Sequence, residues 1–251
     1  MKRRKLILSG LGITGALIVG WGVLPARLRI GKPGDMLPTE GEVALNGWIK
    51  IAKDGGVVLA MHRSDMGQGI HNALSVLVAE ELDVPLKQIR LEQAGHDAIY
   101  GNVAMFVGTL PFHPMQSEGV DKPFAVQSGQ WIVGKVAREL GVNATGGSSS
   151  VKDAWEHLRM AAATTKASLC LAAADLWKVP LGEVKVKDGV ISHASGKGAH
   201  FGEFANGAAA QTPKNVTLKE RKDWSLIGKS TARADVPSKT DGTAVFGMDV
   251  R

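Results

Sequence analysis

The sequence predicts an α+β fold in which helices pack against a mixed sheet. Three patterns support this fold class. Residues 46–95 show the order strand, strand, helix, strand; residues 151–178 carry the apolar stripe of a long helix; and residues 183–193 indicate a second hairpin.

The first strands and the first helix have clear end signals. Apolar and polar residues alternate in GWIKIAKDGGVVLAMHR on both sides of Asp54-Gly55-Gly56, as in a hairpin. A helix is expected next, because apolar residues recur at helical spacing: Ile70, Leu74, Leu77, Val78 and Leu82. Pro85 ends that helix, and KQIRLEQA is typical of another strand.

The middle of the chain has weaker patterns. Residues 100–129 are rich in proline, glycine and histidine and are expected to be irregular. QWIVGKVARELGV predicts a short amphipathic helix that ends at Gly141, since glycine readily adopts the backbone conformation of a helix stop.

A long helix is expected from Val151 to about Lys178. Ser150 and Asp153 stand at capping-box spacing at its start. EVKVKDGVISH follows as a hairpin, and the last residues, GTAVFGMDVR, alternate as in a strand.

The net charge of +6 comes from the N-terminus. Residues 1–32 hold seven of the 30 basic residues and no acidic one, and the other 219 residues carry 23 basic and 24 acidic side chains. We therefore expect no nucleic-acid partner. The one cysteine, Cys170, excludes an intrachain disulfide and a multi-cysteine metal site, and its apolar neighbours favour a buried side chain.

The N-terminus has the pattern of an export signal. Four cations at positions 2–5 precede residues 6–24, which contain no charge and would span roughly 28 Å as a helix. The adjacent Arg3 and Arg4 are typical of a twin-arginine signal. Since no clear cleavage site follows, the alternative is an anchor in the inner membrane, and both alternatives predict a periplasmic protein. Residues 25–45, rich in proline and glycine, are expected to form a linker.

Two loops of small residues each lead into an expected helix. Residues 64–69 contain Gly67-Gln68-Gly69, and residues 144–150 contain two glycines and three serines. Helix N-termini leave about four backbone N–H groups unpaired and carry a partial positive charge. Together the loops would suit an anionic, phosphate-bearing ligand, with the Gln68 amide against a heterocycle edge. Taken singly, each loop is equally well explained as ordinary helix capping.

Other catalytic patterns do not match. Residues 129–136, GQWIVGKV, approach a phosphate-binding P-loop, but Val136 stands where Ser or Thr must meet magnesium. The seven histidines form no HExxH motif or close pair, which predicts no dedicated metal site. The sequence has no Gly-x-Ser-x-Gly elbow that would supply a nucleophile.

The combination of motifs resembles a known family. The chain contains, in order, MHRSDMGQGIHNALSVLVAEELDVP, ATGGSSSVKDAWEHLRMAAATTKASL and IGKSTARADVPSKTDGTAVFGMDVR. Over roughly residues 40–251, these motifs resemble the molybdopterin-binding large subunit of the xanthine oxidase family. Within that family, they are most similar to the branch of isoquinoline 1-oxidoreductase beta subunits and exported aldehyde dehydrogenases.

This resemblance implies a division of the chain into segments. Residues 1–24 would be the signal or anchor, and residues 25–45 the linker. Residues 46–211 would form part of the molybdenum-cofactor-binding α+β domain of molybdenum hydroxylases. Residues 212–251 would begin an α/β-hammerhead domain.

The resemblance also implies a cofactor site. The family's Met-Gly-Gln-Gly and Thr-Gly-Gly-Ser-x-Ser loops match Met66, Gly67, Gln68 and Gly69, and Thr145, Gly146, Gly147, Ser148, Ser149 and Ser150. In the family these loops hold molybdopterin, often in its cytosine dinucleotide form. The pterin itself binds the molybdenum, so no metal-ligating side chain is expected here.

The resemblance further implies oxidation, by hydroxylation, of an aldehyde or an N-heterocycle in a complex with a 2Fe-2S small subunit and a membrane cytochrome c. The family's glutamate base would lie beyond Arg251, so no catalytic residue is expected in this chain. It would then be an N-terminal portion, inactive alone and completed by another polypeptide. The alternative is an envelope-anchored, non-catalytic binding module derived from the same fold.

Overall fold

The main sheet of the protein is mixed and has four strands. A computed structural model describes residues 29–250; the expected export signal lies outside the described residues. The strand order is β1 (Glu42–Ala44), β2 (Ile49–Ala52), β3 (Val57–Met61) and β4 (Ile89–Gln93). The first three strands are antiparallel, and β4 runs parallel to β3.

Helix α2 (Ile70–Leu82) connects the two parallel strands, β3 and β4. Parallel neighbours need such a crossover, because a tight turn can join only antiparallel strands. The order strand, strand, helix, strand predicted from the sequence is therefore confirmed, including the hairpin at Asp54, whose carboxylate accepts a 2.9 Å hydrogen bond from the N–H of Gly56.

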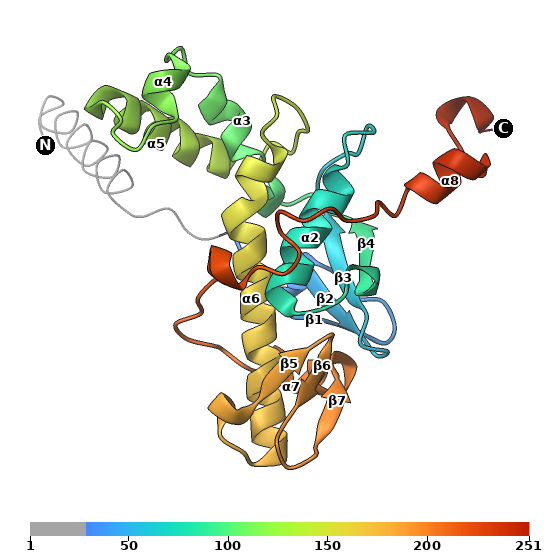
Figure 1. Cartoon of the computed structure of the whole chain (residues 1–251). Helices are drawn as coiled ribbons and strands as arrows, with labels where there is room; N and C mark the ends of the chain where they lie inside the picture. Colours follow the sequence, from blue (N-terminus) through green and yellow to red (C-terminus); the bar gives the residue numbers. More distant parts are fainter. Residues whose placement is uncertain (1–28, 251) are drawn as a thin grey trace, which may run out of the picture.

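The long helix α6 (Ser150–Trp177) connects the other parts of the structure (Figure 1). At its N-terminal end lie three helices, α3 (Val103–Gly108), α4 (Pro114–Ser117) and α5 (Phe124–Leu140). At its other end lie α7 (Phe201–Ala209) and an antiparallel sheet of β5 (Lys185–Lys187), β6 (Val190–Ser192) and β7 (Gly198–His200). Short 3-10 turns occur at Pro33–Asp35, Leu86–Gln88, Ala98–Tyr100, Leu181–Glu183, Arg221–Asp223 and Gly247–Asp249.

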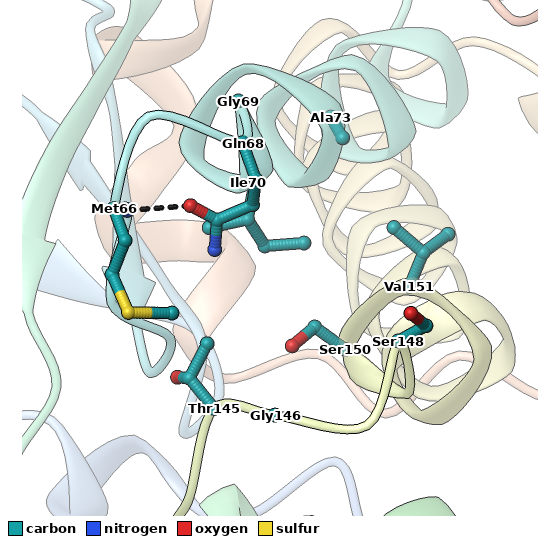
Figure 2. Close-up of a pocket in the computed structure, with 10 residues that line it drawn as sticks. All are labelled: Met66, Gln68, Gly69, Ile70, Ala73, Thr145, Gly146, Ser148, Ser150 and Val151. Atoms are coloured by element: carbon teal, nitrogen blue, oxygen red, sulfur yellow. Dashed lines mark hydrogen bonds between the residues drawn. The ribbon is translucent and has the colours of Figure 1, made fainter.

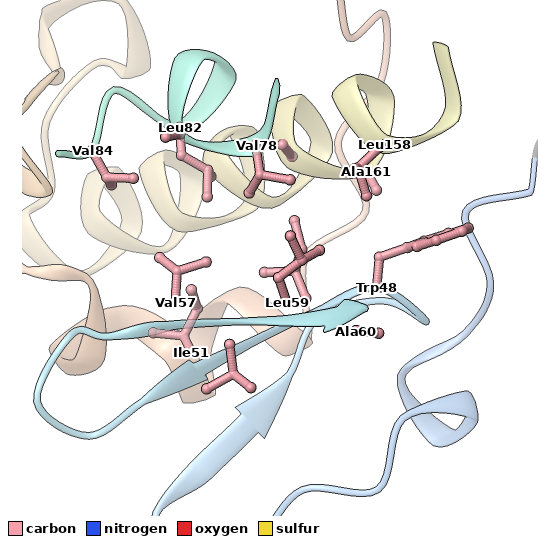
Figure 3. Close-up of a cluster of buried hydrophobic side chains, with 14 of the residues drawn as sticks. Trp48, Ile51, Val57, Leu59, Ala60, Val78, Leu82, Val84, Leu158 and Ala161 are labelled. Atoms are coloured by element: carbon pink, nitrogen blue, oxygen red, sulfur yellow. The ribbon is translucent and has the colours of Figure 1, made fainter. Parts of the chain in front are cut away.

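The core lies where α2 and α6 cover one face of the main sheet (Figure 3). Val78 of α2 and Leu158 of α6 face Leu59 of β3, and Leu59 is completely buried. Burial of such side chains stabilises the fold by roughly 1.5–3 kcal/mol each. The core therefore joins the two helices whose N-terminal loops the sequence singled out.

Residues 100–129 are more regular than expected, because they contain α3, α4 and the start of α5. Each short helix begins at a side-chain cap that a search for long apolar stripes misses. The side chain of Asn102 accepts a 3.0 Å hydrogen bond from the N–H of Met105, and His113 Nδ1 accepts one of 3.3 Å from Met115. Proline and glycine in this segment therefore separate helices instead of preventing them.

The segment expected to be a linker takes part in the fold from residue 29 onward. Arg29 is buried, and its Nη2 lies 2.9 Å from Oδ1 of Asp153. β1 also falls inside this segment and pairs with β2. An ion pair and a strand partner that lie far along the chain order these residues, and a local proline and glycine count cannot detect either.

Residues 212–250 contain one α-helix, α8 (Val236–Asp241), and otherwise follow an irregular path. The strand expected at the end is not formed among residues 242–250, where Val245 and Met248 are exposed. An alternating pattern becomes a strand only beside a partner strand, and the described residues place none there. Across residues 29–250, no helix has the length and apolar character needed to span a bilayer.

Candidate functional site

The loop before α2, residues 64–69, is folded around the carboxylate of Asp65. That carboxylate accepts hydrogen bonds from the N–H groups of Gly67 (2.9 Å), Gly69 (3.2 Å) and His71 (3.1 Å). Burial alone would raise the pKa of Asp65, but these backbone hydrogen bonds outweigh it and lower the pKa. The start of α2 therefore already holds an anion at the N–H of His71, while the N–H groups of Ile70 and Asn72 donate to no acceptor within the described residues.

Gln68 closes the same loop with its side chain. Its Oε1 accepts from the N–H of Met66, and its Nε2 donates to the carbonyl of Ser64 at 2.9 Å. A primary amide has two N–H groups, so one is left to face a ligand. The Gln68 side chain thus stabilises the loop and also places a polar group on the cavity wall.

The loop before α6 leaves its helix end open. Ser149 is the N-cap residue of α6. Its Oγ donates to the carbonyl of Gly146 at 2.7 Å and accepts from Asn102 Nδ2 at 2.8 Å. Within the described residues, the backbone N–H groups of Ser150, Val151 and Lys152 donate to no acceptor. Such a helix end favours an anionic group.

The expected capping box at the start of α6 is not formed. Asp153 turns its carboxylate away from the helix end, toward Arg29, Arg63 and the N–H of Ala104. Two buried guanidinium groups are stronger partners for a carboxylate than one exposed N–H group. As a result, the carboxylate of Asp153 does not accept a hydrogen bond from the free N–H groups of α6.

The two loops meet at one cavity of about 330 Å³ (Figure 2). The N–H of Ser64 donates to Thr145 Oγ1 at 2.9 Å, which connects the loops directly. Seven of the ten predicted site residues line the cavity: Met66, Gln68, Gly69, Thr145, Gly146, Ser148 and Ser150. The other three, Gly67, Gly147 and Ser149, shape the loops without lining it: Gly67 and Gly147 have φ values of +99° and +59°, and Ser149 is buried.

The lining of the cavity combines hydroxyl, amide and apolar groups. Ile70, Ala73 and Val151 complete the wall, and the sequence patterns had indicated these residues only as parts of helices. Ligand sites commonly occupy about 300–1,000 Å³ and place a few polar groups in an apolar wall. Free N–H groups and hydroxyls on the α6 side suit a phosphate, and the apolar residues suit a flat ring. The donor set therefore fits a pterin that carries a phosphate.

Arg233 contacts loop 64–69 from outside the cavity, and sequence reasoning missed this contact. Its Nη1 donates to the carbonyl of Gly67 at 2.9 Å, and its Nη2 lies 4.0 Å from Oδ1 of Asp65. Arg233 follows Gly67 by 166 residues in the chain, so no local pattern could indicate this contact. Asp65 had a local signal, since Asp two residues before glycine is typical of a turn in which the side chain accepts backbone hydrogen bonds.

Side-chain metal ligation has no candidate in the described part of the chain. Across residues 29–250, no three or more His, Cys, Asp or Glu side chains gather in a geometry that could hold a metal ion. Cys170 is half-buried, and burial raises the pKa of its thiol to about 11.

Comparisons with known proteins show which family of domains this chain is similar to. The family model for a molybdopterin cofactor-binding domain matches residues 12–104. The beta subunit of isoquinoline 1-oxidoreductase from Brevundimonas diminuta is 28% identical over all of this chain and 32% of its own length. A membrane-bound aldehyde dehydrogenase (pyrroloquinoline-quinone) of Gluconacetobacter polyoxogenes is 27% identical over all of this chain and 28% of its own length.

A third relative, a nicotinate dehydrogenase subunit of Pseudomonas putida, is 25% identical over 96% of this chain and 17% of its own length. The chain therefore spans about a third, or less, of the length of the curated relatives it matches. Two of these relatives are named as subunits of larger enzymes.

Proposed function

We propose that this chain, which belongs to the molybdopterin-binding large subunits of the xanthine oxidase family, holds the molybdenum cofactor of a complex that hydroxylates an aldehyde or an N-heterocycle. One observation carries the proposal: two glycine-containing loops, far apart in the chain, open on the same cavity. Two helix caps that served only to stabilise their own helices would not be expected to line the same cavity.

The residues of the cavity would divide the work of binding. The N-terminus of α6, with the hydroxyls of Ser148 and Ser150, would hold a phosphate by charge-assisted hydrogen bonds. The free N–H of Gln68 would meet the edge of the pterin ring, and Ile70 would exclude water from its face. The bound molybdenum group supplies the redox chemistry, and this chain supplies binding and orientation.

The finer features of the proposal follow the relatives. Their names include an isoquinoline oxidoreductase, an aldehyde dehydrogenase and a nicotinate dehydrogenase, which supports an aldehyde or N-heterocycle as substrate. We propose the cytosine dinucleotide form of the cofactor, a 2Fe-2S small subunit and a membrane cytochrome c as partners.

The location belongs to the proposal as well. Residues 2–24 combine four cations with an uncharged run of 19 residues. This pattern supports export to the periplasm through a twin-arginine signal, or retention of the segment as an inner-membrane anchor.

Gln68→Ala tests the cofactor site. The substitution removes the amide that faces the cavity, so we expect molybdenum and pterin contents of the purified complex to fall. Gln127→Ala is a matched control, because Gln127 is also exposed and its Nε2 also donates to a nearby carbonyl, that of Lys122, at 2.7 Å. Molybdenum content that is unchanged in Gln68→Ala would argue against the proposed site. Unaltered protein that contains no pterin would instead favour the non-catalytic binding module.

A further inference from the structure

A buried ion pair lies between the residues that border the two loops. Arg63 immediately precedes loop 64–69, and Asp153 is the third residue after loop 144–150. Nη2 of Arg63 lies 2.9 Å from Oδ2 of Asp153, and the two side chains are 0% and 3% exposed. Neither residue lines the cavity.

The guanidinium of Arg63 also holds the chain before the second loop. Its Nη1 donates to Oδ1 of Asn143 at 2.6 Å and to the carbonyl of Tyr100 at 2.8 Å. Asn143 comes directly before loop 144–150, so a single planar group contacts both ends of that loop. A planar fork of fixed N–H directions sets orientation as well as distance.

The carboxylate of Asp153 connects further segments to the same point. Its Oδ1 accepts from Arg29 Nη2 at 2.9 Å and from the N–H of Ala104 at 3.1 Å. The loops themselves consist largely of small residues, and the hydrogen bond between Ser64 and Thr145 is exposed. The rigid contact that fixes the relative position of the two loops is therefore the buried Arg63–Asp153 ion pair.

We propose that the Arg63–Asp153 ion pair is a positioning pair, which sets the separation of the two cofactor loops and so the width of the cavity. This inference rests on the proposed function for its role in cofactor binding. A site must be held to within about 0.5 Å of its productive geometry, and flexible loops reach this only when rigid contacts support them.

A second ion pair of the same kind provides a matched control. Arg159 Nε, on α6, donates to Oε1 of Glu81, on α2, at 2.8 Å, and the two side chains are 6% and 1% exposed. Both pairs join α6 to the β3–α2 unit, yet Arg159 and Glu81 lie farther along their helices from the loops than Asp153 and Arg63, and they do not line the cavity. Breaking either pair leaves a buried charge without its partner, so both changes should destabilise the fold to a similar extent.

A distance measurement across the cavity tests the positioning role without any ligand. Spin labels at Met66→Cys and Val151→Cys, in the full chain with Cys170→Ala, report the separation of the two walls. We expect Asp153→Asn to broaden or shift the distance distribution and Glu81→Gln to leave it unchanged, at a temperature where all variants are folded. Arg63→Lys, which keeps the charge and loses the fork, should broaden it less and replaces Asp153→Asn if that variant does not fold.

Cofactor retention in the purified complex provides the second readout. We expect about tenfold less bound pterin in Asp153→Asn, the scale of loss when support behind a binding group is removed, and wild-type retention in Glu81→Gln. Equal retention in the two variants, or equal distance distributions, would overturn the positioning role. If the unaltered complex holds no pterin, the proposed function fails, and the distance measurement alone then decides whether the pair sets the loop geometry.

Discussion

The backbone N–H of Ser64 donates a hydrogen bond of 2.9 Å to the hydroxyl of Thr145, although 81 residues separate the two in the chain. This bond joins the loop before α2 to the loop before α6 at the wall of the shared cavity. The fold thus turns two ordinary helix starts into one composite site.

Thr145→Val should separate binding from stability. Valine keeps the shape of threonine and removes the acceptor for the Ser64 N–H. Since that N–H is exposed and can bond to water, we expect a stability loss of about 1 kcal/mol or less in chemical unfolding. Pterin content of the complex should fall clearly, and Thr145→Ser, which restores the hydroxyl, should recover it. Retention by Thr145→Val at the wild-type level would contradict this role.

Gly69→Ala should destabilise the loop before α2. Gly69 has φ of +81°, and a Cβ there would lie 3.3 Å from Nη1 of Arg233, which donates to the carbonyl of Gly67. We expect a loss of about 1–2 kcal/mol in the free energy of unfolding, because L-residues are strained in this region. Gly95→Ala is the control, since no atom would lie within 4 Å of its Cβ. Equal midpoints for both variants would contradict the prediction.

Glu80 should make the attachment of the C-terminal segment sensitive to acid. Its carboxylate accepts from the N–H groups of Ser225 (2.9 Å), Leu226 (2.6 Å) and Ile227 (3.0 Å). Burial alone would raise the pKa of Glu80, but these hydrogen bonds outweigh it and lower the pKa from 4.5 to about 2. Its stabilising effect is complete above pH 4.5 and is lost as the pH falls toward 2.

Unfolding experiments between pH 6 and pH 2 can measure this effect. Glu80→Gln should be less stable than wild type at pH 6, and the two stabilities should converge toward pH 2. Substitution of the exposed Glu156 by Gln should leave the wild-type pH profile in place. A constant stability difference across this range would refute the assignment to Glu80.

His157 should make stability depend on pH in a higher range than Glu80 does. Burial, and then the nearby charge of Arg29, lowers the pKa of His157 from 6.5 to about 4. The folded state keeps the ring neutral while the unfolded state takes up a proton, so stability is full above pH 6.5 and falls as the pH drops from 6.5 to about 4. His157→Phe should therefore lose less stability than wild type between pH 7 and pH 4.5 in urea unfolding.

The loss of stability on acidification should be smaller in His157→Phe than in wild type, but it should not disappear. His62 is also buried, and burial keeps its pKa well below the usual value. The double variant with His62→Phe should flatten the profile further, and parallel profiles of wild type and double variant would contradict this account.

Arg3→Lys with Arg4→Lys should block export of the full chain. A twin-arginine signal depends on the arginine side chains, so retaining the charge should not restore it. Fractionation of cells would measure the periplasmic and membrane-bound protein, with Lys2→Arg as the control. Normal delivery of the double variant would exclude the twin-arginine signal.

Local patterns in the sequence were sufficient for the main elements of the fold. The hairpin at Asp54, helix α2 and most of α6 follow from alternation and helical spacing, because each pattern reports burial of its own residues. α3 and α4 were missed, since they are short and depend on caps at Asn102 and His113. The expected strand at the end of the chain failed for the opposite reason, as a strand needs a partner.

The sequence by itself determined the α+β class and which loops consist of small residues at helix starts, because propensity and spacing are properties of neighbours in the chain. Only the tertiary structure decided that these loops share a cavity and that Arg63 meets Asp153 close to both of them. The physical reason is that hydrogen bonds and ion pairs between residues 80 or more positions apart depend on packing of the core, which no local pattern records.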